Sequence, residues 1–129
     1  MSKKYKVILN EKQIEILVES LDLYSRLPSG QFDEIFFKML GLGKLTNRTE
    51  FEKISKQLKE LYFPELSENE FYGIHQDSVS EDARIGFDMI QVLRHKLSWD
   101  KEPEGGITVN FHEPMKTSTK ENLIEIKDV

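Results

Sequence analysis

Four polar side chains recur at helical spacing between residues 81 and 99. They are Arg84, Asp88, Gln91 and His95, separated by four, three and four residues, which places them on one face of a helix. The remaining side chains of this segment are mostly apolar, so we expect a helix that is buried around most of its circumference. A polar stripe on such a helix must be solvated, paired or used, and it is therefore a candidate pocket or interface.

Cations and an aromatic ring accompany this stripe near the end of the same helix. Arg94, His95 and Lys96 precede Trp99, which is the only tryptophan in the chain. Cationic side chains bind phosphate, and aromatic rings stack on bases. Favourable contact of cations with the C-terminal end of a helix is a structural explanation for the same residues. The pattern predicts a site for a small anionic ligand, with ligand-binding residues Arg84, Asp88, Gln91, Arg94, His95 and Trp99, and with Lys96 and Tyr72 as an added cation and a second stacking ring.

The stretch "WDKEPEGG" (99–106) follows directly. It closes one end of the predicted pocket, or it is only a corner in which Pro and Gly let the backbone reverse into a strand. Both explanations are compatible with its composition, because Gly and Pro are the usual turn formers.

Motifs of several enzyme classes are missing. The histidines His75, His95 and His112 lie far apart without metal-binding spacing, and neither a nucleophile elbow nor a phosphate loop is present. The chain has no cysteine, which excludes disulfides, thiolate zinc sites and cysteine nucleophiles. We therefore expect a binding protein rather than an enzyme, with no catalytic residues, no metal and no cofactor.

Capping residues and apolar periodicity predict the elements that carry these side chains. Asn10 with Gln13, and Asn47 with Glu50, have the spacing of helix starts, and Ser78 or Ser80 begins the last helix. Alternating apolar residues predict short strands. The sequence thus predicts an α+β fold in one domain, residues 1–129, with about four helices (11–26, within 31–40, 49–62 and 81–99) and a small antiparallel sheet formed by the N-terminal and C-terminal strands (5–10, 106–111 and 123–128).

Charge and hydropathy narrow the expected partners. The chain of 129 residues has 18 basic and 23 acidic residues, a net charge of −5, which disfavours general nucleic-acid binding because phosphate neutralisation needs an excess of cations. The absence of a long apolar run and of a signal peptide argues against a membrane partner and for the cytoplasm. Abundant aromatic residues and unpaired strand edges predict a homo-oligomer; the aromatic residues are Phe36, Phe37, Phe63, Phe71 and Tyr72.

Three stretches resemble a group of small uncharacterised proteins encoded by bacteriophages and prophages. They are "LDLYSRLPSGQFDEI", "ARIGFDMIQVLRHKLSWD" and "PEGGITVNF", and the likeness spans most of the chain. The resemblance implies the cytoplasm of a bacterial host cell. It also implies an accessory binding protein in host–virus interaction, because small phage proteins often bind a host component.

Two functions stay open on this basis. In the first, the protein counteracts host defence by sequestering a small anionic, nucleotide-like ligand in an oligomer-lined pocket. In the second, it is a protein-interaction module that inhibits a host protein through an acidic, aromatic-bearing surface, such as the loop at 63–78. A small hydrolase is the least favoured alternative.

Overall fold

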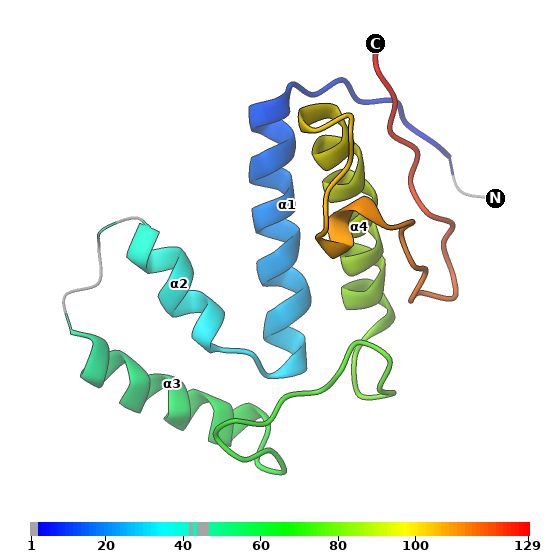
Figure 1. Ribbon diagram of the computed structural model, residues 1–129. Helices are drawn as coiled ribbons and strands as arrows, with labels where there is room; N and C mark the ends of the chain where they lie inside the picture. Colours follow the sequence, from blue (N-terminus) through cyan, green and yellow to red (C-terminus); the bar gives the residue numbers. More distant parts are fainter. Residues whose placement is uncertain (1–2, 42, 44–46) are drawn as a thin grey trace.

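Four α-helices in two lobes make up the part of the chain that the structure describes (Figure 1). The computed structural model describes residues 3–41, 43 and 47–129. The first lobe pairs the first and last helices with residues 102–129, and the second, which we call the α2–α3 lobe, spans residues 31–79. The elements are α1 (Glu11–Arg26), the 3₁₀ turn η1 (Leu27–Ser29), α2 (Asp33–Gly41), α3 (Arg48–Tyr62), α4 (Glu81–Lys101) and the 3₁₀ turn η2 (Val109–Phe111).

Helices α1 and α4 run side by side in opposite directions and hold the core (Figure 1). Val18 of α1 and Ile90 and Leu93 of α4 are buried at their contact. Ile124 and Ile126 from the C-terminal end pack against the same cluster. The core is therefore closed by a helix pair and by an extended segment, not by a sheet.

Close approach of the two helices depends on Gly86. Ser25 of α1 is buried and donates a hydrogen bond from its hydroxyl to the carbonyl of Ala83, at 3.1 Å. A Cβ atom on Gly86 would lie 3.0 Å from the Ser25 hydroxyl oxygen and 3.5 Å from the ring of Tyr24. The hydrogen bond ties α1 to the first turn of α4, and the glycine makes room for it.

Aromatic contacts hold the α2–α3 lobe. Phe32, just before α2, lies 5.9 Å from Phe63, and Phe36 of α2 lies 5.7 Å from Phe51, both measured between ring centroids. The loop after α3 returns to the first lobe, where the Tyr72 amide donates to the carbonyl of Ser29 at 2.8 Å. Among the described side chains of residues 31–79, Phe36 and Val79 are the apolar ones that are buried.

The predicted helix starts are confirmed by their caps. The Asn10 side chain accepts from the Gln13 amide and the Gln13 side chain accepts from the Asn10 amide, both at 2.9 Å, which is a capping box. Asn47 caps α3 by accepting from the Glu50 amide at 3.0 Å. Of the two candidate serines, Ser80 caps α4. The four helices lie where the sequence places them, within two residues at each end.

The predicted α+β fold is wrong, because no residue that the structure describes belongs to a strand. Residues 5–10 and 123–128 are extended, but neither joins a backbone ladder among the described residues. In the third predicted strand, residues 109–111 form η2 instead. The C-terminal segment has an alternating pattern because it lies on a helix, with Ile124 and Ile126 toward the core. Apolar residues at every second position do not distinguish a segment that lies on a helix from a half-buried strand.

Backbone geometry explains the corner at 99–106. Gly105 has a φ angle of +91°, which favours glycine because it carries no Cβ. A Cβ atom on Gly106 would lie 2.4 Å from the ring of Phe111, which folds back over it. Both glycines are therefore required by local packing.

No helix within residues 3–41 or 47–129 has the length and apolar character that a bilayer crossing needs.

We expect Gly86→Val to lower the free energy of unfolding by about 1–3 kcal/mol, because the added methyl groups overpack the α1–α4 contact. The matched control is Gly73→Val in the loop, where the nearest atom to an added Cβ is a side-chain oxygen at 3.7 Å. Urea unfolding followed by circular dichroism measures both. Equal stability of the two variants would contradict the close contact at Gly86.

Candidate functional site

Asp88 lies at the centre of the predicted polar stripe, and its carboxylate is occupied by the chain itself. It is 4% exposed. One carboxylate oxygen accepts from the amide and hydroxyl of Thr117, at 2.8 and 2.6 Å. The other accepts from the amide and hydroxyl of Ser118, at 3.0 and 2.6 Å. Burial raises the pKa of Asp88, but these hydrogen bonds from Ser118 and Thr117 outweigh it and hold the pKa below its ordinary value.

The next members of the stripe also face the backbone of the C-terminal segment, which we define as residues 110–129. The amide of Gln91 makes two bonds with Met115, donating to its carbonyl at 2.9 Å and accepting from its N–H at 3.1 Å. His95 lies 3.0 Å from the carbonyl of Asn110 through Nδ1. A carbonyl oxygen can only accept, so Nδ1 is the protonated nitrogen.

Trp99 continues this pattern at the end of α4. Its indole N–H donates to the carbonyl of Phe111 at 3.1 Å, and the two rings meet edge to face at 5.3 Å. The side chain is therefore already packed on one ring, although it is 39% exposed. Lys96 fastens the end of the chain, with its Nζ 2.8 Å from Asp100 and 3.1 Å from Asp128. The hydrogen bonds that Lys96 donates to the carboxylates of Asp100 and Asp128 raise its pKa.

The stripe begins one turn earlier than the sequence analysis placed it. Glu81 accepts from the amides of Thr119 and Lys120, at 2.6 and 2.7 Å, and the Lys120 and Thr119 amides lower its pKa although burial opposes them. Its position three residues before Arg84 continues the spacing of the stripe, so extending the pattern by one turn would have found it. The hydroxyl pair Thr117–Ser118 carried no comparable signal.

Arg84 takes part chiefly through its backbone. Its carbonyl accepts from the Thr117 hydroxyl at 3.3 Å, and its guanidinium donates to the carbonyl of Gln76 at 2.5 Å. The Nε atom is buried without a partner. Arg84, Asp88, Gln91, His95 and Trp99 thus bind residues of their own chain. A ligand-binding role for these five stays a prediction, and it would require a ligand to compete with these bonds.

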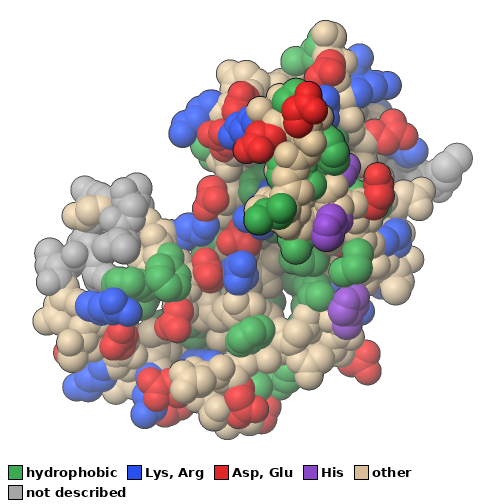
Figure 2. Space-filling model, viewed as in Figure 1, with side chains coloured by type: hydrophobic (Ala, Val, Ile, Leu, Met, Phe, Trp, Pro, Cys, Tyr) green, Lys and Arg blue, Asp and Glu red, His purple; other side chains and the backbone are tan. Residues whose placement is uncertain are grey.

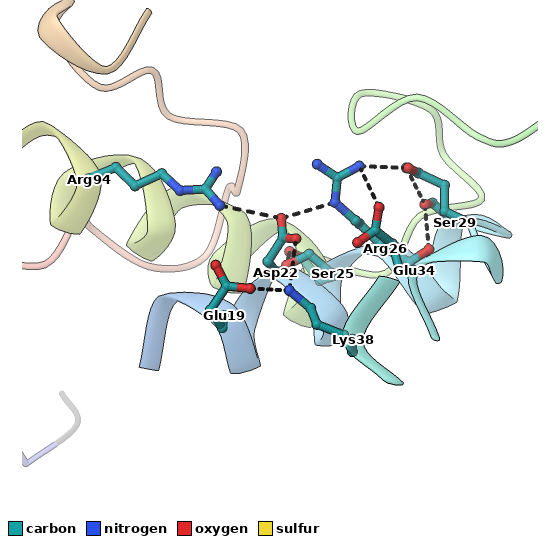
Figure 3. Close-up of polar contacts among 10 residues, drawn as sticks. Glu19, Asp22, Ser25, Arg26, Ser29, Glu34, Lys38 and Arg94 are labelled. Atoms are coloured by element: carbon teal, nitrogen blue, oxygen red, sulfur yellow. Dashed lines mark hydrogen bonds and ion pairs between the residues drawn. The ribbon is translucent and has the colours of Figure 1, made fainter. Parts of the chain in front are cut away.

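Arg94 lies apart from the stripe, in a network of charges that joins three helices (Figure 3). Asp22 of α1 is at its centre, 3.0 Å from Arg26 and 3.8 Å from both Arg94 and Lys38. Lys38 of α2 also pairs with Glu19. The network therefore connects α1 with α2 and α4, and the cations it contains are balanced by acids.

An open groove of about 750 Å³ lies beside this network, between α1, α4 and the start of the α2–α3 lobe. Figure 2 shows the hollow between the two lobes, with acidic and basic side chains gathered in it. We call it the α1–α4 groove. Its apolar lining includes Ile16 and Leu23 of α1 and Leu97 of α4, and Ile16 is 56% exposed. The charged residues around it are Lys12, Glu15, Glu19, Lys38, Arg94 and Lys101.

Charges at this rim are largely neutralised inside the protein. Lys38 pairs with Glu19, and Lys101 lies 3.3 Å from both Glu11 and Glu15. The hydrogen bonds that Lys101 donates to the carboxylates of Glu11 and Glu15 raise its pKa. The groove therefore has an apolar floor and a rim of paired ions. The sequence analysis missed it because nothing in the sequence says which faces of α1 and α4 remain uncovered.

The described part of the chain holds no cluster of possible metal ligands. Within it, no three His, Asp or Glu side chains come together as a metal site would require.

Tyr72, the second predicted stacking ring, lies in the loop after α3, where its hydroxyl donates to Glu65 at 2.5 Å. It is therefore on a different lobe from Trp99.

No family model, curated protein or solved structure matches this chain. The function is therefore inferred from the geometry of the described residues, and the resemblance to phage-encoded proteins stays a prediction.

We expect Asp88→Asn to lower the free energy of unfolding by about 1–3 kcal/mol, because the asparagine amide turns a donor toward the buried N–H of Thr117 or Ser118. The control is Asp100→Asn on the exposed end of α4, where loss of a surface ion pair costs less than about 1 kcal/mol. Thermal and urea unfolding measure both variants. Equal effects would mean that the polar stripe is only a solvated face.

Acid should reduce the difference in unfolding free energy between wild type and Asp88→Asn. The pKa of Asp88 is lowered in the folded protein, so its stabilisation is present above the unfolded value of about 3.9 and is lost as the pH falls through the folded pKa. The stability difference between wild type and Asp88→Asn should stay constant from about pH 7 to 5 and then narrow on further acidification. A difference that widens in acid would contradict the assignment.

Proposed function

We propose that this protein is a protein-interaction module whose α1–α4 groove binds an amphipathic helix of a partner protein. The observation that carries the proposal is an exposed apolar floor between two helices, formed around Ile16, Leu23 and Leu97 and bordered by paired ions. An apolar centre with a polar rim is the usual composition of a protein interface. Helices bind in such grooves through apolar residues three and four positions apart.

Shape supports a helical partner over a compact ligand. The α1 side of the groove extends from Lys12 to Leu23, which is about 16 Å at 1.5 Å per residue. This length matches roughly three turns of a partner helix. The open side lets an elongated segment enter from solvent, whereas a small ligand is usually enclosed on most of its surface.

Electrostatics points the same way. Lys38 and Lys101 are held by acids of the protein itself, so they offer little net attraction to a phosphate group. A mixed rim instead suits a partner helix whose own flanks carry both signs. We take the partner to be a protein of the bacterial host cell, on the strength of the resemblance to phage-encoded proteins, and its inhibition in the cytoplasm to be the role of the complex.

Sequestration of a small anionic, nucleotide-like ligand is the second candidate, and one observation favours it. The Arg94 guanidinium is about a third exposed and is 3.8 Å from Asp22, too far for a hydrogen bond. Together with Lys12 on the same groove, it could hold a phosphate. Titration of purified protein with nucleotides by calorimetry tests this candidate, and binding that Arg94→Ala abolishes would favour it over the helical partner.

We expect Ile16→Asp to weaken binding of the partner at least tenfold, because it places a charge on the apolar floor of the groove. The partner is first identified by comparing the host proteins that purify with tagged wild type and with the variant. The dissociation constant for the purified partner is then measured by calorimetry for both proteins.

The matched control for this experiment is Val109→Asp. Val109 lies in η2, is 76% exposed and does not line the groove. It should leave the dissociation constant within about twofold, since it touches no part of the groove. Equal loss of binding in both variants, or retention of the same partner by Ile16→Asp, would contradict the proposed function.

A further inference from the structure

Helix α3 presents its apolar side chains to solvent and buries polar ones. Four large apolar residues form what we call the apolar face of α3: Ile54, Leu58, Leu61 and Tyr62, which are 49%, 38%, 78% and 71% exposed. The buried residues of this helix are Ser55 and Lys59. The spacing of Ile54, Leu58 and Leu61 in the sequence places them on one face, as in an amphipathic helix that packs on a core. In the structure Tyr62 meets the ring of Phe32 edge to face, at 6.3 Å between centroids, yet all four side chains of this face remain exposed to solvent.

Lys59 explains why the helix is turned this way. Its ammonium group is directed under the following loop, where it donates to the carbonyls of Glu68 and Glu70. These bonds satisfy a buried cation and fix the rotation of α3 about its own axis. With Lys59 and Ser55 inward, the apolar face lies at the side of the helix, outside the contact with α2.

The described residues of the α2–α3 lobe contribute few buried apolar side chains around α3. Phe36 and Val79 are its buried apolar side chains among the described residues, and α2 is the helix against which α3 packs most. A helix of 15 residues is marginally stable without tertiary packing. Burial of its apolar face would therefore stabilise α3, and a partner that is always present would supply this stabilisation permanently.

We propose that a second copy of this chain covers the apolar face of α3, so that the protein is a homodimer joined by two α3 helices. A second copy is present wherever the chain is made, and it carries the same apolar face, as an interface with two-fold symmetry requires. This interface is separate from the α1–α4 groove.

Spacing and charge along α3 fit a helix pair. Ile54, Leu58 and Leu61 follow one another at four and three residues, which is the spacing of a and d positions in paired helices. The positions beside this pattern on its solvent side are Glu50 and Gln57. A second helix therefore meets one acid and one amide there, without a cluster of like charges to repel it.

The test is the molar mass in solution, measured by sedimentation equilibrium over a range of micromolar concentrations. Wild type should have about twice the 15.1 kDa of one chain. Leu61→Asp should weaken association at least a hundredfold and give the monomer, because it places a charge in the interface. Leu61→Ala, which adds no charge and keeps a good helix former, should weaken association about tenfold and guards against a variant that fails to fold.

Val109→Asp is the matched control. Val109 lies in η2 and is 76% exposed, against 78% for Leu61, so the two substitutions differ in place rather than in exposure. The control should remain a dimer, as should Ile16→Asp in the groove. A monomeric wild type at all concentrations would overturn the proposal. So would equal weakening of association by the substitutions at Leu61 and Val109.

Discussion

The buried carboxylate of Asp88 is the constraint on which the first lobe depends. A charge with so little solvent must be fully hydrogen-bonded, and all four of its partners come from Thr117 and Ser118. Those bonds fix the C-terminal segment along α4. Once it is fixed, Ile124 and Ile126 reach the core between α1 and α4. The polar stripe is thus the means by which a long extended segment is bound to a helix without a sheet.

This arrangement divides α4 into three sides. One packs on α1, one carries the polar stripe and holds the C-terminal segment, and the third borders the α1–α4 groove. Most of the side chains that were predicted to bind a ligand are therefore hydrogen-bonded to other residues of the chain. The groove and the apolar face of α3 both leave apolar side chains exposed, and this is why we favour protein partners over a small anionic ligand.

Helix positions could be predicted because their signals are local. Asn10, Asn47 and Ser80 cap helices within three residues of themselves, and apolar periodicity sets the lengths. The polar stripe was also recognised, but its partner was not. Asp88 meets Thr117 across 29 residues, and a serine or threonine in a polar link carries no signal for such a contact. The rotation of α3 was equally hidden, because it depends on where Lys59 finds its carbonyls.

Amide hydrogen exchange by nuclear magnetic resonance tests most directly whether the stripe binds the C-terminal segment. The amides of Met115, Thr117, Ser118, Thr119 and Lys120 donate to side chains of α4, so they should exchange far more slowly than a free chain, although they lie outside any helix. The amides of residues 4–9 make no backbone hydrogen bond within the described chain and should exchange rapidly. Equally rapid exchange of Thr117 and Ser118 would contradict the account.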